Sequence, residues 1–161
     1  MKTIHSILIG IVVLISISAC GTKPDIEPEM SLGEISQSQL FVNNKVFADG
    51  FKSTQLSTEE IKSINSWPET LRVAIYFGTW CHDSQREVPR FLKIASTNNH
   101  ISTQLVALDH HKTDPHGLAQ NKGIKYTATF IVSIGDKEIG RIIERPRESL
   151  VTDISNMLQK L

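Results

Sequence analysis

The chain has 161 residues and no formal net charge, because its 17 lysines and arginines balance 17 aspartates and glutamates. No basic stripe or cationic cluster stands out, which excludes the usual sequence signature of a nucleic-acid-binding protein. Nucleic acid is therefore not an expected partner.

Residues 1–19 are interpreted as the signal peptide of a bacterial lipoprotein. An apolar run at residues 7–17 follows a short, weakly basic start. This run is too short for a membrane-spanning helix, which needs roughly 20 apolar residues. The Ile-Ser-Ala-Cys sequence at residues 17–20 resembles the lipobox of bacterial lipoproteins. This resemblance implies cleavage before Cys20 and a diacylglyceryl group on its sulfur, with acyl chains such as palmitate. The alternatives are an ordinary secretory signal or an uncleaved anchor.

A lipid on Cys20 would anchor the protein to a membrane of the bacterial cell envelope, since two acyl chains are enough for stable anchoring. Gly21 stands where an aspartate would favour retention at the inner membrane. The outer membrane is therefore favoured, with the domain facing the periplasm or the exterior. Residues 20–39 are polar, contain prolines and show no periodicity, which predicts a flexible tether. Residues 40–161 then form one domain of ordinary size.

The first predicted elements after the tether are a hairpin and a helix. Residues 40–42 and 45–47 flank two asparagines, which tolerate a positive φ, and this pattern predicts a small hairpin. Ser57 is a candidate N-cap with acidic residues in the turn that follows, which predicts a helix ending near Ser66.

Strands and helices alternate through the rest of the chain. Short apolar runs predict strands, and apolar residues at helical spacing predict helices. The predicted strands are residues 71–77, 104–108, 129–134 and 138–143, and the predicted helices are residues 83–95, 115–120 and 149–160. This alternation predicts a βαβ unit and a central sheet, and the late hairpin adds an antiparallel edge. The fold class is therefore α/β.

A cysteine motif lies between the first long strand and the helix that follows it. Residues 80–84 read Trp-Cys-His-Asp-Ser, and Pro89 falls eight residues after Cys81. Together with the element order, these features resemble the thioredoxin superfamily over about residues 71–161, with a looser match back to residue 40. The resemblance implies a thioredoxin-like three-layer fold, in which a central mixed β-sheet is flanked by helices.

Three positions depart from the pattern of this superfamily. Ser84 replaces the resolving cysteine, and Ile75 replaces a buried aspartate that assists deprotonation of that second thiol. The resemblance then implies that Cys81 can form a mixed disulfide and cannot release it by internal attack. Ala128 occupies the position of a cis-proline. Because a cis bond before a residue other than proline costs about 2.5–4 kcal/mol, the Thr127–Ala128 bond is predicted to be trans.

Cys81 is the candidate nucleophile. The helix dipole and the unpaired N–H groups at a helix N-terminus favour the thiolate over the thiol, although the negative charge of Asp83 opposes this. His82 and Ser84 are the residues expected to tune its reactivity. The predicted function is monothiol thiol–disulfide exchange, in which an outside thiol resolves the mixed disulfide.

The expected partners are protein thiols or disulfides, or a low-molecular-weight thiol. The reaction would be the reduction of mixed disulfides or the isomerisation of wrong disulfides. No cofactor is expected. Trp80, Thr127 and Ala128 are expected to border the groove that receives the client.

Two other classes of function compete with this prediction. One is a non-catalytic binding module that uses the same groove for a protein partner. The other is a metal-binding accessory protein, because a soft thiolate at Cys81 and imidazoles at His110 and His111 suit copper or zinc. Only one sulfur is available and no ligand spacing is diagnostic, so no metal ligand is assigned. These alternatives leave open whether the protein is an enzyme.

Overall fold

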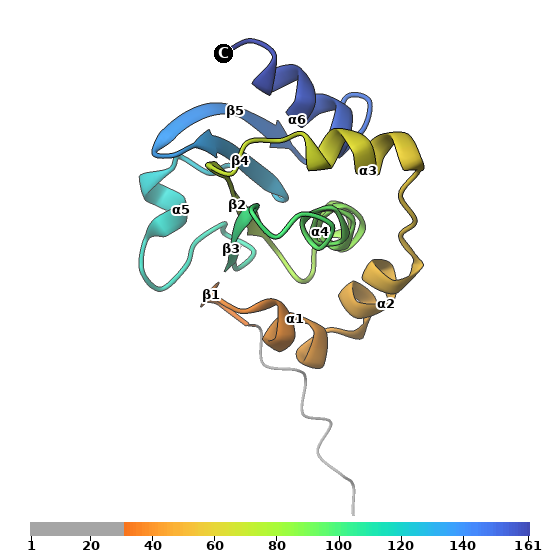
Figure 1. Ribbon diagram of the computed structural model, residues 1–161. Coiled ribbons are helices and arrows are strands. Elements are labelled where there is room, and N and C mark those ends of the chain that lie inside the picture. Colours follow the sequence, from red (N-terminus) through yellow and green to blue (C-terminus); the bar gives the residue numbers. More distant parts are fainter. Residues whose placement is uncertain (1–30) are drawn as a thin grey trace, which may run out of the picture.

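The computed structural model describes residues 31–161, so the predicted signal peptide, the lipobox and Cys20 lie outside the described residues. The centre of the fold is a five-stranded sheet with the order β1-β3-β2-β4-β5 (Figure 1). The strands are β1 (Gly33–Glu34), β2 (Leu71–Phe77), β3 (Ser102–Ala107), β4 (Thr129–Ile134) and β5 (Lys137–Ile143). The helices are α1 (Gln37–Asn43), α2 (Lys45–Ser53), α3 (Thr58–Asn65), α4 (His82–Ala95), α5 (Leu118–Asn121) and α6 (Leu150–Leu158).

The sheet is mixed and is covered by helices on both faces. β2 pairs in parallel with β3 and antiparallel with β4, while β1 and β5 pair antiparallel at the two edges. Figure 1 shows α4 on one side of the sheet and α5 on the other. The predicted α/β fold with a mixed central sheet between helical layers is confirmed. Among residues 31–161, no helix combines the length and the apolar character needed to cross a membrane.

The alternation of side chains along β2 divides the core in two. Val73 and Ile75 join the main core, which α4 covers with Val88 and Phe91. Tyr76 points to the other face and packs in a smaller cluster with residues of β3, β4 and α5. This period-two pattern is what a central strand requires when both faces of the sheet are covered.

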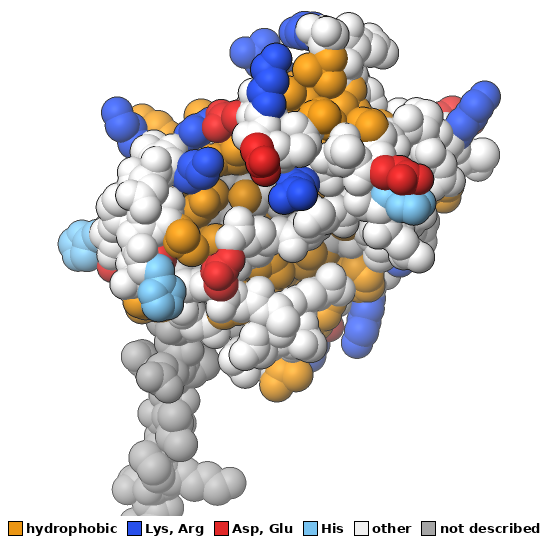
Figure 2. Space-filling view, turned by 60° about the vertical axis from the view of Figure 1, so that its left-hand side comes forward, with side chains coloured by type: hydrophobic (Ala, Val, Ile, Leu, Met, Phe, Trp, Pro, Cys, Tyr) orange, Lys and Arg blue, Asp and Glu red, His pale blue; other side chains and the backbone are white. Residues whose placement is uncertain are grey.

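The charged side chains follow the balanced composition. On the face seen in Figure 2, basic and acidic side chains are interspersed and no broad patch of one sign forms.

The local signals of the middle and C-terminal parts of the chain were sufficient to predict their elements. The bounds of β2 and β4 agree with prediction, and the other predicted strands and helices differ by a few residues at their ends. α3 begins with a capping box, in which the Ser57 hydroxyl accepts from the Glu60 N–H and the Glu60 carboxylate accepts from the Ser57 N–H.

The predicted hairpin at residues 40–47 is wrong, because this segment forms α1 and the start of α2. A capping box between Ser36 and Gln39 begins α1 and satisfies the first N–H groups of the helix. Leu40 and Phe47 are both fully buried in the main core. The apolar residues of this segment therefore serve two short helices packed on the core, and Asn44 joins the two helices.

The folded part also begins earlier than the predicted boundary at residue 40. Gly33 pairs with Ala107 and Glu34 with Val106, which adds β1 to the edge of β3. The segment predicted as a tether, residues 20–39, therefore contributes its last residues to the sheet and to α1.

Candidate functional site

Cys81 lies in the loop between β2 and α4. The Cys81 N–H donates to the Gly78 carbonyl at 3.0 Å and closes a turn after β2, and Cys81 itself is the N-cap of the 14-residue helix α4. A Cβ on Gly78 would lie 2.5 Å from Cε2 of Trp80, so glycine is required where the chain passes beneath the indole. Cys81 is half-buried. Its sulfur therefore lies at the positive end of the helix dipole and remains accessible to solvent.

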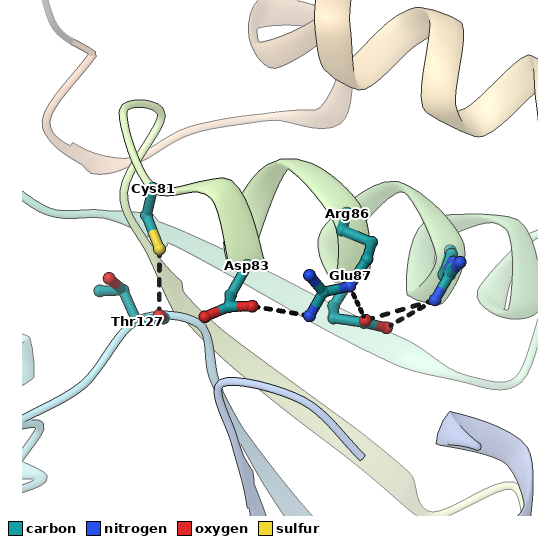
Figure 3. A network of polar contacts seen from close by, with 6 residues as sticks. Cys81, Asp83, Arg86, Glu87 and Thr127 are labelled. Carbon is teal, nitrogen blue, oxygen red and sulfur yellow. Dashed lines mark hydrogen bonds and ion pairs between the residues drawn. The ribbon is translucent and has the colours of Figure 1, made fainter. Parts of the chain in front are cut away.

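The sulfur of Cys81 contacts the loop before β4 (Figure 3). Its S–H donates a hydrogen bond to the carbonyl oxygen of Thr127, with the two atoms 3.1 Å apart. The Thr127–Ala128 peptide bond is cis, so the predicted trans bond is wrong. That prediction weighed the preference of an isolated bond. It did not include the packing of Ala128, which is fully buried, or the contact between Thr127 and Cys81.

Opposing effects act on the pKa of Cys81. Burial raises this pKa, whereas hydrogen bonds from the Thr127 side chain, from the Ser84 N–H and hydroxyl, and from the Asp83 N–H lower it. The hydrogen bonds together outweigh the burial, so the pKa lies below the ordinary value of a thiol. Hydrogen bonds to the charged form stabilise that form, so the thiolate is stabilised here relative to the thiolate of an ordinary cysteine.

The position of the second thiol is filled by a buried hydroxyl. Ser84 is fully buried, and its Oγ accepts a hydrogen bond from the Gly78 N–H at 3.2 Å. Ile75 is also fully buried, in the main core. His82 is exposed at the first position of α4. A hydroxyl at residue 84 cannot form a disulfide with Cys81.

Trp80 joins the cysteine loop to the loop after β3. Its Nε1–H donates to the Leu108 carbonyl at 3.1 Å, and its ring stacks on the His110 imidazole with 4.2 Å between the ring centroids. The Lys112 ammonium lies 5.3 Å from the centroid of the indole. These contacts leave Trp80 half-buried.

The histidines do not assemble a metal site with Cys81. Within residues 31–161, no group of three His, Cys, Asp or Glu side chains is arranged to hold a metal ion. The His110 ring is occupied by its stack on Trp80, and His111 is exposed in the same loop. Cys81, His110 and His111 are therefore not brought together as a ligand set.

A polar network on α4 was missed by the sequence reasoning. Arg86 donates to Asp83 and to Glu87, at 2.6 Å in each case, and Glu87 is buried (Figure 3). Two signals pointed to it. Asp83 and Arg86 stand at i and i+3 of the predicted helix, and Glu87 and Arg90 have the same spacing.

A half-buried thiol caps the helix that follows β2, the central strand of a mixed sheet between helical layers. This arrangement is that of a thioredoxin-like protein. The chain belongs to the thioredoxin family, since a family model described as thioredoxin matches residues 34–154. No curated protein matches the sequence.

Several solved structures have a similar fold, including the following two. One is a protein of unknown function from Pseudomonas aeruginosa, with 13% identity and a TM-score of 0.58 over 72% of this chain and 83% of that chain. The other is an HIV epitope scaffold, with 13% identity and a TM-score of 0.59 over 79% of this chain and 99% of that chain. At this level of identity the likeness concerns the fold alone.

Proposed function

We propose that this protein carries out monothiol thiol–disulfide exchange through Cys81. The proposal depends above all on one observation, a half-buried Cys81 at the start of α4 whose pKa lies below the ordinary value. Membership of the thioredoxin family supports the same class of reaction. Protein thiols and disulfides, or a low-molecular-weight thiol, are the proposed reactants.

The proposed reaction has two exchange steps. The Cys81 thiolate attacks one sulfur of a client disulfide, which forms a new bond between Cys81 and the client and releases the other client sulfur as a thiolate. A second thiolate, from outside the domain, then attacks the mixed disulfide and restores the Cys81 thiolate. The second thiolate must come from a partner, since Ser84 stands where a resolving thiol would be and the other cysteine, Cys20, is proposed below to be lipidated.

The client groove is proposed to run between the cysteine loop and the loop before β4. Trp80 would offer the edge of its half-buried indole. Thr127 and Ala128 are 5% and 0% exposed, so they would border the groove through the backbone rather than through their side chains. His82 is exposed beside Cys81 and would contact the incoming sulfur group.

Exchange through Cys81 predicts that the full chain forms a mixed disulfide with a glutathionylated peptide and that Cys81→Ser forms none. The reason is that the thiolate is the attacking group and a serine hydroxyl is not. Mass spectrometry of trapped adducts, together with release of the free peptide when reduced glutathione is added, measures both steps. Ser96→Ala, on the exposed C-cap of α4, is the matched control and should behave as the wild type. A wild-type chain whose Cys81 is alkylated but forms no adduct would overturn the proposal and favour the binding module.

We also propose that Cys20 is lipidated and anchors the domain to the bacterial envelope, with the outer membrane favoured and the domain facing the periplasm or the exterior. Cys20→Ser is expected to abolish incorporation of labelled palmitate in a bacterial host, because Cys20 is the proposed site of attachment. The variant should also move from the membrane fraction to the soluble fraction, because it lacks the acyl chains that anchor the protein. Cys81→Ser should keep both the label and the membrane association. Equal labelling of the wild type and Cys20→Ser would contradict this proposal.

A further inference from the structure

A buried carboxylate fixes an arginine on the helix that Cys81 caps. The Glu87 side chain is 3% exposed, and its Oε1 accepts from Arg86 Nε at 2.6 Å and from Arg90 Nη1 at 3.3 Å. A buried charge needs such partners, because its removal from water is costly unless it is paired and hydrogen-bonded. Glu87 therefore restrains Arg86 more strongly than an exposed carboxylate would.

Arg86 uses its other edge to hold Asp83. Its Nη2 donates to Asp83 Oδ1 at 2.6 Å, so one guanidinium bridges a buried and a half-exposed carboxylate. Figure 3 shows the Asp83 carboxylate directed to the same side of α4 as the Cys81 sulfur, with Arg86 and Glu87 in line behind it. The planar guanidinium suits this bridging geometry, and a lysine ammonium does not reproduce it.

We propose that Arg86 is a positioning residue that neutralises Asp83 beside the Cys81 sulfur, and that buried Glu87 holds Arg86 in place. An unpaired carboxylate two residues from the thiolate would disfavour it by repulsion, and the bridging guanidinium compensates that repulsion. This inference rests on the proposed exchange reaction and names the residue that offsets the charge of Asp83 at the Cys81 thiolate.

Other charged and titratable groups lie on the loops next to the cysteine loop, and all are shared by the variants below. His82 follows Cys81 on the same helix. His110 and Lys112 lie on Trp80, and Lys125 and Tyr126 precede Thr127. The Glu144 N–H donates to the Ala128 carbonyl at 2.6 Å, and Arg145 follows it. Any influence of these groups on the thiol is the same in every variant, so it cancels when the variants are compared.

The test removes the charges of Arg86 and Asp83 singly and together, in the full chain in detergent. The rate of Cys81 alkylation by iodoacetamide is measured as a function of pH, and its midpoint reports the thiol pKa. Mass spectrometry identifies the modified residue. Arg86→Gln should raise the midpoint pH, so that alkylation at a pH below the midpoint is about threefold slower than in the wild type. Asp83→Asn should lower the midpoint pH, so that alkylation at the same pH is about threefold faster. The double variant Asp83→Asn with Arg86→Gln should return close to the wild-type curve. Arg90→Gln is the matched control, since Arg90 pairs with Glu87 and not with Asp83.

Three results would overturn the inference. The first is an unchanged midpoint in Arg86→Gln. The second is an equal shift in Arg86→Gln and Arg90→Gln, which would mean that only the net charge of the helix matters. The third is a double variant that keeps the full shift of Arg86→Gln, which would mean a structural role that Asp83 does not mediate. Exchange with a glutathionylated peptide, measured on the same samples, separates this inference from the proposed function, because the midpoints report the thiolate even if no exchange occurs.

Discussion

Replacing Ser84 with cysteine should turn the monothiol site into a dithiol site that reduces protein disulfides. Residues 81 and 84 are the N-cap and N3 positions of α4, which are close enough that an N-cap side chain ordinarily bonds the N3 N–H. The thiolate introduced at position 84 would attack the Cys81 sulfur of a mixed disulfide, form an internal disulfide with it and release the client as a thiolate. An added dithiol then reduces that internal disulfide. We expect insulin reduction by Ser84→Cys at least about tenfold above the wild-type background.

The measurement is insulin precipitation with dithiothreitol as the reductant, together with the fraction of trapped mixed disulfide. Ser84→Cys should gain turnover and lose the trapped adduct, while Ser84→Ala, which also lacks the buried hydroxyl, should keep the single-thiol behaviour. Burial of residue 84 would raise the pKa of the new thiol, since its site is fully buried and Ile75 supplies no acid to assist its deprotonation. The gain should therefore be larger at pH 8 than at pH 6. Adduct that accumulates unchanged in Ser84→Cys would contradict the exchange geometry proposed for Cys81.

The sheet was predictable because its signals are local. The runs that form β2 and β4 are apolar, rich in branched residues and bounded by turn residues, so both their existence and their limits follow from the sequence. α1 and α2 were not predicted because the capping box of Ser36 and Gln39 lies in a segment assigned to the tether. The aromatic and branched residues after it then matched a hairpin, and only their burial against the core decides between the two structures.

The thiol was predictable, and its surroundings were not. The Trp-Cys motif after a buried strand was enough to predict that Cys81 begins a helix. Its contact with Thr127 depends on the antiparallel pairing of β2 with β4, in which Tyr76 lies opposite Thr129, and no local pattern encodes that pairing. The sequence also presented Asp83 as an unopposed negative charge. The structure pairs it with Arg86, because the burial of Glu87 fixes the arginine between the two carboxylates.

The contact between Cys81 and Thr127 should depend on the core beneath it, and Phe130→Ala tests this. Phe130 is fully buried on β4, lies opposite Ile75 in the sheet and packs on Phe91 of α4, with ring centroids 5.7 Å apart. Truncation to alanine is expected to lower the free energy of unfolding by about 3–5 kcal/mol, through lost burial and the cavity that remains. That is a large part of the roughly 5–15 kcal/mol by which domains of this kind are stable.

Urea denaturation of the full chain in detergent, followed by circular dichroism, measures this loss as a lower midpoint with an unchanged slope. Val42→Ala is the matched control, because Val42 is 84% exposed and its truncation should change the stability by less than about 0.5 kcal/mol. The packing of Phe130 on Phe91 joins the strand that follows Thr127 to the helix that Cys81 caps. Phe130→Ala should therefore also increase hydrogen exchange of the Cys81 and Gln85 N–H groups, which donate to the Gly78 and Cys81 carbonyls, under conditions where the domain is still folded. If the stability falls and the exchange of these two groups does not change, the geometry of the thiol is held by the loops alone and not by the core.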